Sequence, residues 1–191
     1  MKDKTDRAAS TNVATNEHLR ATWFQLLENL YQSITEKSDL ECATRCSARC
    51  CPKSKASQNS SDAVGHVAIM LPFEMEYIAS KTNAPAERLQ QERIQFTHDT
   101  YLDIGFTTSS TPCPFLSDDN RCGIYDIRPL DCRSFPLIPA FDLEGDIGFR
   151  VDGECPSAIT FSNAYQMQLK AIWKELLPNL PMSYRIAYNQ L

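Results

Sequence analysis

The sequence predicts an α+β fold: a single domain with helices at both ends around a cysteine-rich core with short hairpins. Apolar residues recur at helical spacing near both ends of the chain, short apolar runs and turn residues lie between them, and the cysteines fall in the middle. No internal repeat and no linker separates two folded units. We therefore expect a disordered tail at residues 1–15 and one cysteine-cluster domain at residues 16–191.

Both terminal helices are predicted from an apolar stripe. Residues 1–15 are rich in Thr, Asn, Lys and Asp, a composition typical of disorder. A helix is then expected from Glu17 to about Glu36, and another over residues 161–177, which Pro178 and Pro181 end. The stripes consist of Leu19, Trp23, Leu26, Leu27, Leu30, Tyr31 and Ile34, and of Tyr165, Leu169, Ile172, Trp173, Leu176 and Leu177.

Shorter elements are predicted between these helices. Residues 64–71 form an apolar run of strand length, and the Pro72-Phe-Glu-Met-Glu segment that follows is typical of a helix start, because proline and acidic residues suit a first turn. Residues 83–98 contain good helix formers after Pro85 and predict a further helix.

Two hairpins are predicted in the second half of the chain. One lies around the Asp118-Asp-Asn turn, between Cys113-Pro-Phe-Leu and Cys122-Gly-Ile-Tyr. The other covers residues 137–149, with Glu144-Gly145-Asp146 as its turn.

Composition restricts the class of protein. At 191 residues the chain is long enough for an ordinary core, so it does not need metal merely to fold. The polar N-terminus is not followed by the apolar core of a signal peptide, and no run approaches the ~18 apolar residues of a membrane span. A net charge of −5 argues against nucleic acid as a partner. We expect a cytoplasmic protein, with no membrane or nucleic-acid partner and with a protein partner or substrate left open.

The eight cysteines fall into two groups of four. The first is Cys42, Cys46, Cys50 and Cys51, and the second is Cys113, Cys122, Cys132 and Cys155. Four thiolates hold one tetrahedral zinc or one cubane iron–sulfur cluster, and reduced cytoplasmic thiols more often bind metal than form disulfides. All-thiolate ligation disfavours a catalytic zinc. For His18, His66 and His98 a structural role is favoured over ligation.

The spacing of the first group argues against two separate local sites. On a regular helix Cys42 and Cys50 would lie ~12 Å apart along the axis, too far for two ligands of one zinc. The side chains of adjacent Cys50 and Cys51 also tend to diverge. A mixed site that takes ligands from both groups is therefore at least as well supported as two local ones.

Two arginines flank Cys132 in the sequence, Arg128 and Arg133. Guanidinium groups would offset the excess negative charge of four thiolates and donate to sulfur. Ordinary ion pairs with Asp126 or Asp131 are an equally supported alternative.

These motifs resemble the YkgJ-type cysteine-cluster family, described as a zinc- or iron-chelating domain. The resemblance rests on the vicinal pair that ends the first group, on Cys113-Pro-Phe-Leu, Cys122-Gly-Ile-Tyr, Arg128-Pro, Cys132-Arg-Ser-Phe-Pro and Cys155-Pro, and covers about residues 40–157. Family members often begin Cys-x-x-Cys-x-x-Cys-Cys, whereas both gaps here are three residues long. The resemblance implies metal binding, and distant kinship with flagellin lysine N-methylase, which is thought to use an iron–sulfur cluster.

The sequence thus predicts a metal-binding protein whose eight cysteines coordinate an iron–sulfur cluster (4Fe-4S) and/or zinc. The resemblance favours iron–sulfur, whereas the spacing leaves both open. One alternative is a cluster-dependent enzyme of the lysine methyl transfer type, for which Arg128, Arg133, Tyr125 and Asp131 are the clustered polar residues, with no catalytic residue assigned. The other is a thiol-based metal carrier or redox sensor.

Overall fold

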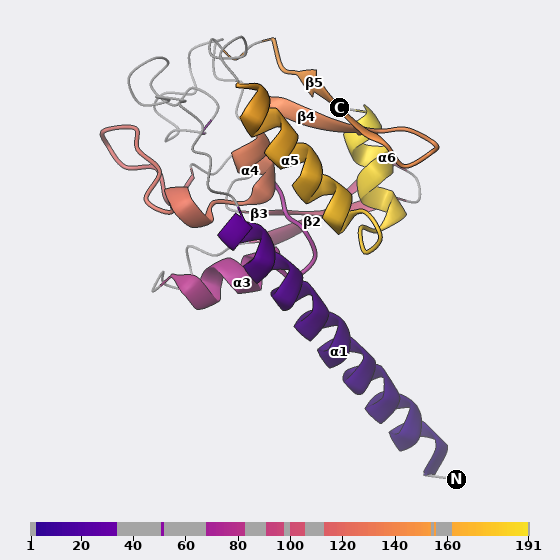
Figure 1. Cartoon of the computed structure of the whole chain (residues 1–191). Helices are drawn as coiled ribbons and strands as arrows, with labels where there is room; N and C mark the ends of the chain where they lie inside the picture. The colour runs from indigo at the N-terminus through magenta and orange to yellow at the C-terminus, as the bar shows by residue number, and fades with distance from the viewer. Residues whose placement is uncertain are drawn as a thin grey trace.

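Helices cover both ends of the chain and small antiparallel sheets lie between them in the computed structural model (Figure 1). The structure describes residues 3–33, 51, 68–82, 91–97, 100–105, 113–153, 155 and 162–190. This arrangement confirms the predicted α+β fold with helices at both ends.

The first helix, α1, spans Asp3–Ser33 and buries the predicted stripe through Trp23, Leu27, Leu30 and Tyr31. Leu19 is an exception, being 48% exposed. The helix begins well before Glu17, and its N-terminal part extends away from the other elements (Figure 1). Such a projecting segment relies on local hydrogen bonds, and isolated helices are marginal in water. A disordered tail at residues 1–15 and a domain start at residue 16 therefore stay predictions.

The first sheet corrects one prediction. Its strands are β1 (Ala68–Ile69), β2 (Gln91–Thr97) and β3 (Thr100–Gly105), in the antiparallel order β1-β3-β2. The helix predicted over residues 83–98 is wrong where β2 lies, and residues 83–90 and 98 fall outside the described chain. Helix propensity is a weak prior, and the backbone pairing of β2 with β3, in which Ile94 lies opposite Leu102, outweighs it here. β1 confirms a strand within residues 64–71.

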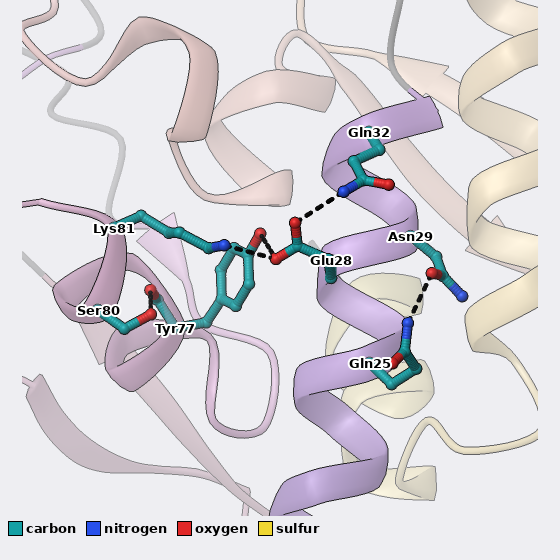
Figure 2. A network of polar contacts seen from close by, with 7 residues as sticks. All are labelled: Gln25, Glu28, Asn29, Gln32, Tyr77, Ser80 and Lys81. Carbon is teal, nitrogen blue, oxygen red and sulfur yellow. Dashed lines mark hydrogen bonds and ion pairs between the residues drawn. The ribbon is translucent and has the colours of Figure 1, made fainter.

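The predicted helix start after Pro72 is confirmed by α3 (Glu74–Lys81), which packs against α1. The Tyr77 ring stacks on Tyr31, with centroids 5.2 Å apart, and meets Phe24 edge-on at 5.9 Å. Figure 2 shows the polar border of this contact, where the Glu28 carboxylate accepts hydrogen bonds from the Tyr77 hydroxyl (2.9 Å) and from Gln32 (2.8 Å) and pairs with Lys81 (2.7 Å). The C-terminal half of α1 is thereby held on α3.

The predicted hairpin in the second cysteine group is present in minimal form. Leu116 and Cys122 form an isolated antiparallel bridge, and the Gly123 amide donates to the Phe115 carbonyl at 2.7 Å. A 3₁₀ turn, η3 (Tyr125–Ile127), and a short helix, α4 (Leu130–Ser134), follow. Sequence periodicity did not predict α4 because five residues are too few to show a helical stripe.

The second predicted hairpin is confirmed by β4 (Leu137–Phe141) and β5 (Ile147–Val151), which pair in antiparallel register. The predicted last stripe is α5 (Asn163–Leu176), capped by the Ser162 hydroxyl, which accepts from the Tyr165 amide at 3.1 Å. An unpredicted helix, α6 (Met182–Gln190), follows Pro181.

α5, α6 and β4 meet in an aromatic core. The Trp173 ring lies edge-on to Tyr188, with centroids 5.2 Å apart, and edge-on to Phe141 at 5.9 Å. Trp173 is fully buried and its indole Nε1 donates to the Ser134 hydroxyl at 3.2 Å, which connects this core to the end of α4. Among the described helices, none is both long and apolar enough to cross a membrane.

Replacing Gly145 with Ala should destabilise the β4–β5 hairpin by about 1 kcal/mol, because Gly145 has a φ of +84°, a conformation that L-residues with a Cβ resist. Space is not the obstacle, since an added Cβ would meet Leu177 at an ordinary 3.5 Å. Urea midpoints measure the loss. The matched control is Gly148→Ala in β5, where a Cβ meets nothing within 4 Å. Equal stability of the two variants would contradict the strain argument.

Candidate metal centre

Three cysteines of the second group are carried by neighbouring local structures. The Cys113 carbonyl accepts the Leu116 amide at 3.2 Å and so starts the turn, Cys122 lies in the β-bridge opposite Leu116, and Cys132 lies in α4. All three side chains are half-buried. The structure thus presents them from a turn, a bridge and a helix that follow one another in the chain.

Two of these thiols act electrostatically on the third, Cys132. Burial raises the pKa of Cys132 well above its ordinary value, and charge on Asp131, Cys113 and Cys122 raises it further, whereas Arg128 lowers it. Burial also raises the pKa of Cys122, against a main-chain hydrogen bond from Ile124 and the charge of Arg128. Cys113 and Cys122 therefore lie within electrostatic reach of Cys132. A metal cation among the thiols would reverse the shift, because positive charge stabilises thiolates.

The other predicted ligands are placed less fully. Cys51 and Cys155 are half-buried, and the Cys155 amide donates to the Asp152 carbonyl at 3.3 Å, just after β5. Cys42, Cys46 and Cys50 lie outside the described residues. Within the described part of the chain, no three His, Cys, Asp or Glu side chains are grouped so that they could hold a metal ion. The eight-cysteine ligand set stays a prediction.

Arg128 is the arginine whose charge acts on the cysteines. It is buried, and its guanidinium lies over the Tyr125 ring, 4.2 Å from the centroid. Burial lowers the pKa of Arg128, but charge on Tyr125, Tyr165, Cys132 and Cys122 outweighs it and raises the pKa on balance. A permanent positive charge therefore lies beside two of the predicted ligands.

Arg133 is directed elsewhere. Its Nη2 donates to the main-chain carbonyl of Asp126, and its guanidinium lies over the Tyr31 ring, 5.3 Å from the centroid. Burial, followed by the charge of Arg128, lowers the pKa of Arg133. The predicted contact with Asp126 thus occurs through the backbone, and a role for Arg133 beside the metal stays a prediction.

A buried carboxylate that the sequence did not single out holds the same segment in place. Glu74 is fully buried, and its Oε1 accepts from the Leu130 amide (2.8 Å) and the Tyr31 hydroxyl (2.9 Å) while its Oε2 accepts from the Leu71 amide (2.9 Å). The sequence predicted only one role for Glu74, that of a favourable negative charge in the first turn of a helix. Its bond to the Leu71 amide is local, but its bonds to the Leu130 amide and the Tyr31 hydroxyl span 56 and 43 residues, and no local pattern indicates those two.

Asp131, the residue after Leu130, also anchors this segment through its carboxylate. Its Oδ2 accepts from the Ile69 amide and its Oδ1 from the Tyr188 hydroxyl, each at 2.9 Å. The two carboxylates anchor Leu130 and Asp131, the residues directly before Cys132. The position of this predicted ligand is therefore set by the protein core.

The donor set fits a soft metal. Half-buried thiols, a main-chain hydrogen bond to Cys122 and a buried guanidinium beside two thiols all suit a thiolate centre, whose ligands carry more negative charge than the metal neutralises. His18 is exposed on α1, a position that does not support a role as a metal ligand. These donors suit zinc and iron equally, since four thiolates bind either.

Comparison with known proteins gives one family. The family model CxxCxxCC, described as "Putative zinc- or iron-chelating domain", matches residues 41–156, more than half of the chain. The match spans both cysteine groups and confirms the cysteine-cluster family predicted from the motifs. No curated protein and no solved structure is significantly similar to the chain.

The buried Glu74 carboxyl should make the stability of the metal-free protein depend on pH. Burial raises the pKa of Glu74 to about 7, against lowering by hydrogen bonds from Leu130, Leu71 and Tyr31. The folded state therefore holds a proton that the unfolded state, with a pKa near 4.5, releases. The free energy of unfolding should fall by up to about 3 kcal/mol as pH rises from about 4.5 to 7, and this fall should end above that range.

Urea titrations at several pH values, with chelator present, measure this slope. Glu74→Gln should remove it and lower stability at every pH, because one amide end faces either the Leu71 or the Leu130 N–H and leaves it unsatisfied. An unchanged slope in Glu74→Gln would show that another group is titrating.

Proposed function

Because the chain belongs to the CxxCxxCC family of metal-chelating domains, we propose that its eight cysteines form one composite centre for an iron–sulfur cluster (4Fe-4S) and/or zinc. The proposed ligands are Cys42, Cys46, Cys50, Cys51, Cys113, Cys122, Cys132 and Cys155. The observation that carries the proposal is that a turn, a β-bridge and α4 present Cys113, Cys122 and Cys132 in succession, and that Cys113, Cys122 and Arg128 all act electrostatically on Cys132.

A role in holding metal follows from how these thiols are supported. Cys132 directly follows residues anchored by buried carboxylates, and Cys122 is held in a β-bridge. Preorganised thiols bind a metal without first ordering their own segment, which favours retention over exchange. We propose that the centre stabilises the domain or a surface where a protein docks.

Arg128 is the proposed neighbour that balances the charge of the thiolates, and a supporting role beside the metal is also proposed for Arg133. A tetrathiolate zinc site carries a net charge near −2, and a buried guanidinium reduces the repulsion among its sulfurs. This arrangement suits a permanent centre.

The enzyme alternative receives less support from the described residues. Asp131 binds the Ile69 amide and the Tyr188 hydroxyl, and Tyr125 lies under the Arg128 guanidinium. Both side chains thus have structural contacts that account for their positions. The carrier or sensor alternative expects exposed thiols, whereas the described cysteines are half-buried.

The proposal includes a cytoplasmic location and a protein partner, with neither nucleic acid nor a membrane as a partner. The net charge of −5 argues against nucleic acid as a partner. The proposed thiol ligands support a cytoplasmic location, because reducing compartments keep cysteines as free thiols.

Anaerobic purification followed by elemental analysis and visible absorption tests the proposal directly. Iron with labile sulfide and a charge-transfer band would identify a cluster, whereas colourless protein with stoichiometric zinc would overturn the cluster and leave the zinc centre. Protein with neither metal, after reconstitution with each, would overturn the whole proposal.

Cys132→Ser should lose bound metal and the stability that the metal contributes. A hydroxyl is a poor ligand for zinc or iron at neutral pH, so the loss should exceed tenfold in affinity. Thermal unfolding with and without chelator separates the two effects: the variant should match the wild type with chelator and fall below it without. Full metal content in the variant would show that Cys132 is a packed core thiol.

Arg128→Met should weaken zinc binding about tenfold, because methionine keeps an apolar side chain over Tyr125 and removes the positive charge. Competition with a zinc chelator measures the dissociation constant. The control is Arg185→Met, which removes another partly buried guanidinium, bound to the Leu177 carbonyl. Equal affinities of the two variants would exclude a charge-balancing role for Arg128.

A further inference from the structure

Tyr31 connects α1 to the segment that carries Arg128 and Cys132. Its side chain is 8% exposed, and its hydroxyl lies 2.9 Å from the Glu74 Oε1 and 2.9 Å from the main-chain carbonyl oxygen of Arg128. One hydroxyl thus joins α1, α3 and the turn before α4, across a sequence separation of 97 residues from Tyr31 to Arg128.

Two side chains pack on the ring of Tyr31. It stacks on Tyr77 of α3 with an interplanar angle of 21°, and the Arg133 guanidinium lies over the ring, 5.3 Å from its centroid. Arg133 directly follows Cys132 in the sequence. Tyr31 therefore contacts the backbone or side chains of residues on both sides of this predicted ligand.

The Tyr31 hydroxyl has a single hydrogen and two acceptors at 2.9 Å, the Glu74 Oε1 and the Arg128 carbonyl oxygen, so these two acceptors share that hydrogen. Burial and the Glu74 carboxyl raise the pKa of Tyr31 well above its ordinary value, and a charged Cys132 thiol adds a smaller contribution. Tyr31 is therefore a neutral donor within electrostatic reach of Cys132.

The position of Tyr31 in the chain gives this contact its significance. α1 ends at Ser33, and the chain then leads to Cys42, the first cysteine of the first group. A contact between the last turn of α1 and Arg128 shortens the loop that must close to bring the two cysteine groups together, which lowers the entropic cost of assembling one centre.

We propose that Tyr31 is a positioning residue for the composite centre and that metal binding is coupled to the docking of α1 on Glu74 and Arg128. This inference rests on the proposed function. Binding free energies are reciprocal, so docking of α1 raises metal affinity, and metal binding in turn protects the C-terminal half of α1 from opening.

The test compares two tyrosines that each lose one buried hydroxyl. Tyr31→Phe should raise the zinc dissociation constant about tenfold, measured by chelator competition, because the ring still packs but the link to Arg128 is lost. Tyr184→Phe is the matched control: Tyr184 is 4% exposed and donates to the Met70 carbonyl at 2.7 Å. It should bind zinc with wild-type affinity.

Hydrogen exchange supplies a readout that a merely structural role would not change. In the wild type, zinc should slow exchange of the amides of residues 20–33, whereas in Tyr31→Phe these amides should exchange at one rate with and without zinc. Equal zinc affinities of Tyr31→Phe and the wild type, or an equal loss in Tyr184→Phe, would overturn the coupling. If Tyr31→Phe does not fold, the wild type still tests the coupling, which is overturned if zinc does not slow amide exchange in α1. A wild type that binds neither zinc nor iron would instead refute the proposed function itself.

Discussion

The Glu74 carboxylate is the interaction on which the arrangement of the described elements most depends. It lies fully buried, where an unsatisfied carboxylate would be very costly, and it accepts hydrogen bonds from Leu71, Leu130 and Tyr31. These partners belong to the segment between β1 and α3, the start of α4 and the last turns of α1. Because one group satisfies all three, none of these elements can move without leaving a buried polar atom unpaired.

Asp131 extends the same constraint to a sheet edge. β1 is only two residues long and pairs with β3 alone in the described sheet, so its outer edge needs other partners. The Asp131 carboxylate accepts the Ile69 amide, and the Tyr184 hydroxyl donates to the Met70 carbonyl. Side chains of α4 and α6 thus take the place of a further strand, which ties the sheet to the C-terminal helices.

This polar network explains how a thiolate centre can be added to an ordinary core. The buried apolar and aromatic core of the described elements consists of residues other than cysteine, and Cys122 and Cys132 pack against it as partly buried side chains. The residues directly before Cys132 are anchored to this core by carboxylates. The fold thereby sets the position of one proposed ligand and of Arg128. The other proposed ligands would be ordered by the metal itself, because the metal binds cysteines as thiolates and holds them close together.

The amino-acid sequence by itself determined the helices with an apolar stripe, the β4–β5 hairpin and the cysteine family, because each depends on a local period, a local turn or a short motif. Tertiary structure alone decided that residues 91–97 pair as a strand, that Glu74 is buried, and that Arg128 is the arginine beside the thiols. The physical reason is sequence separation. Tyr31 meets Glu74 and Arg128 at separations of 43 and 97 residues, and contacts between such distant residues leave no period or spacing in the sequence from which they could be predicted.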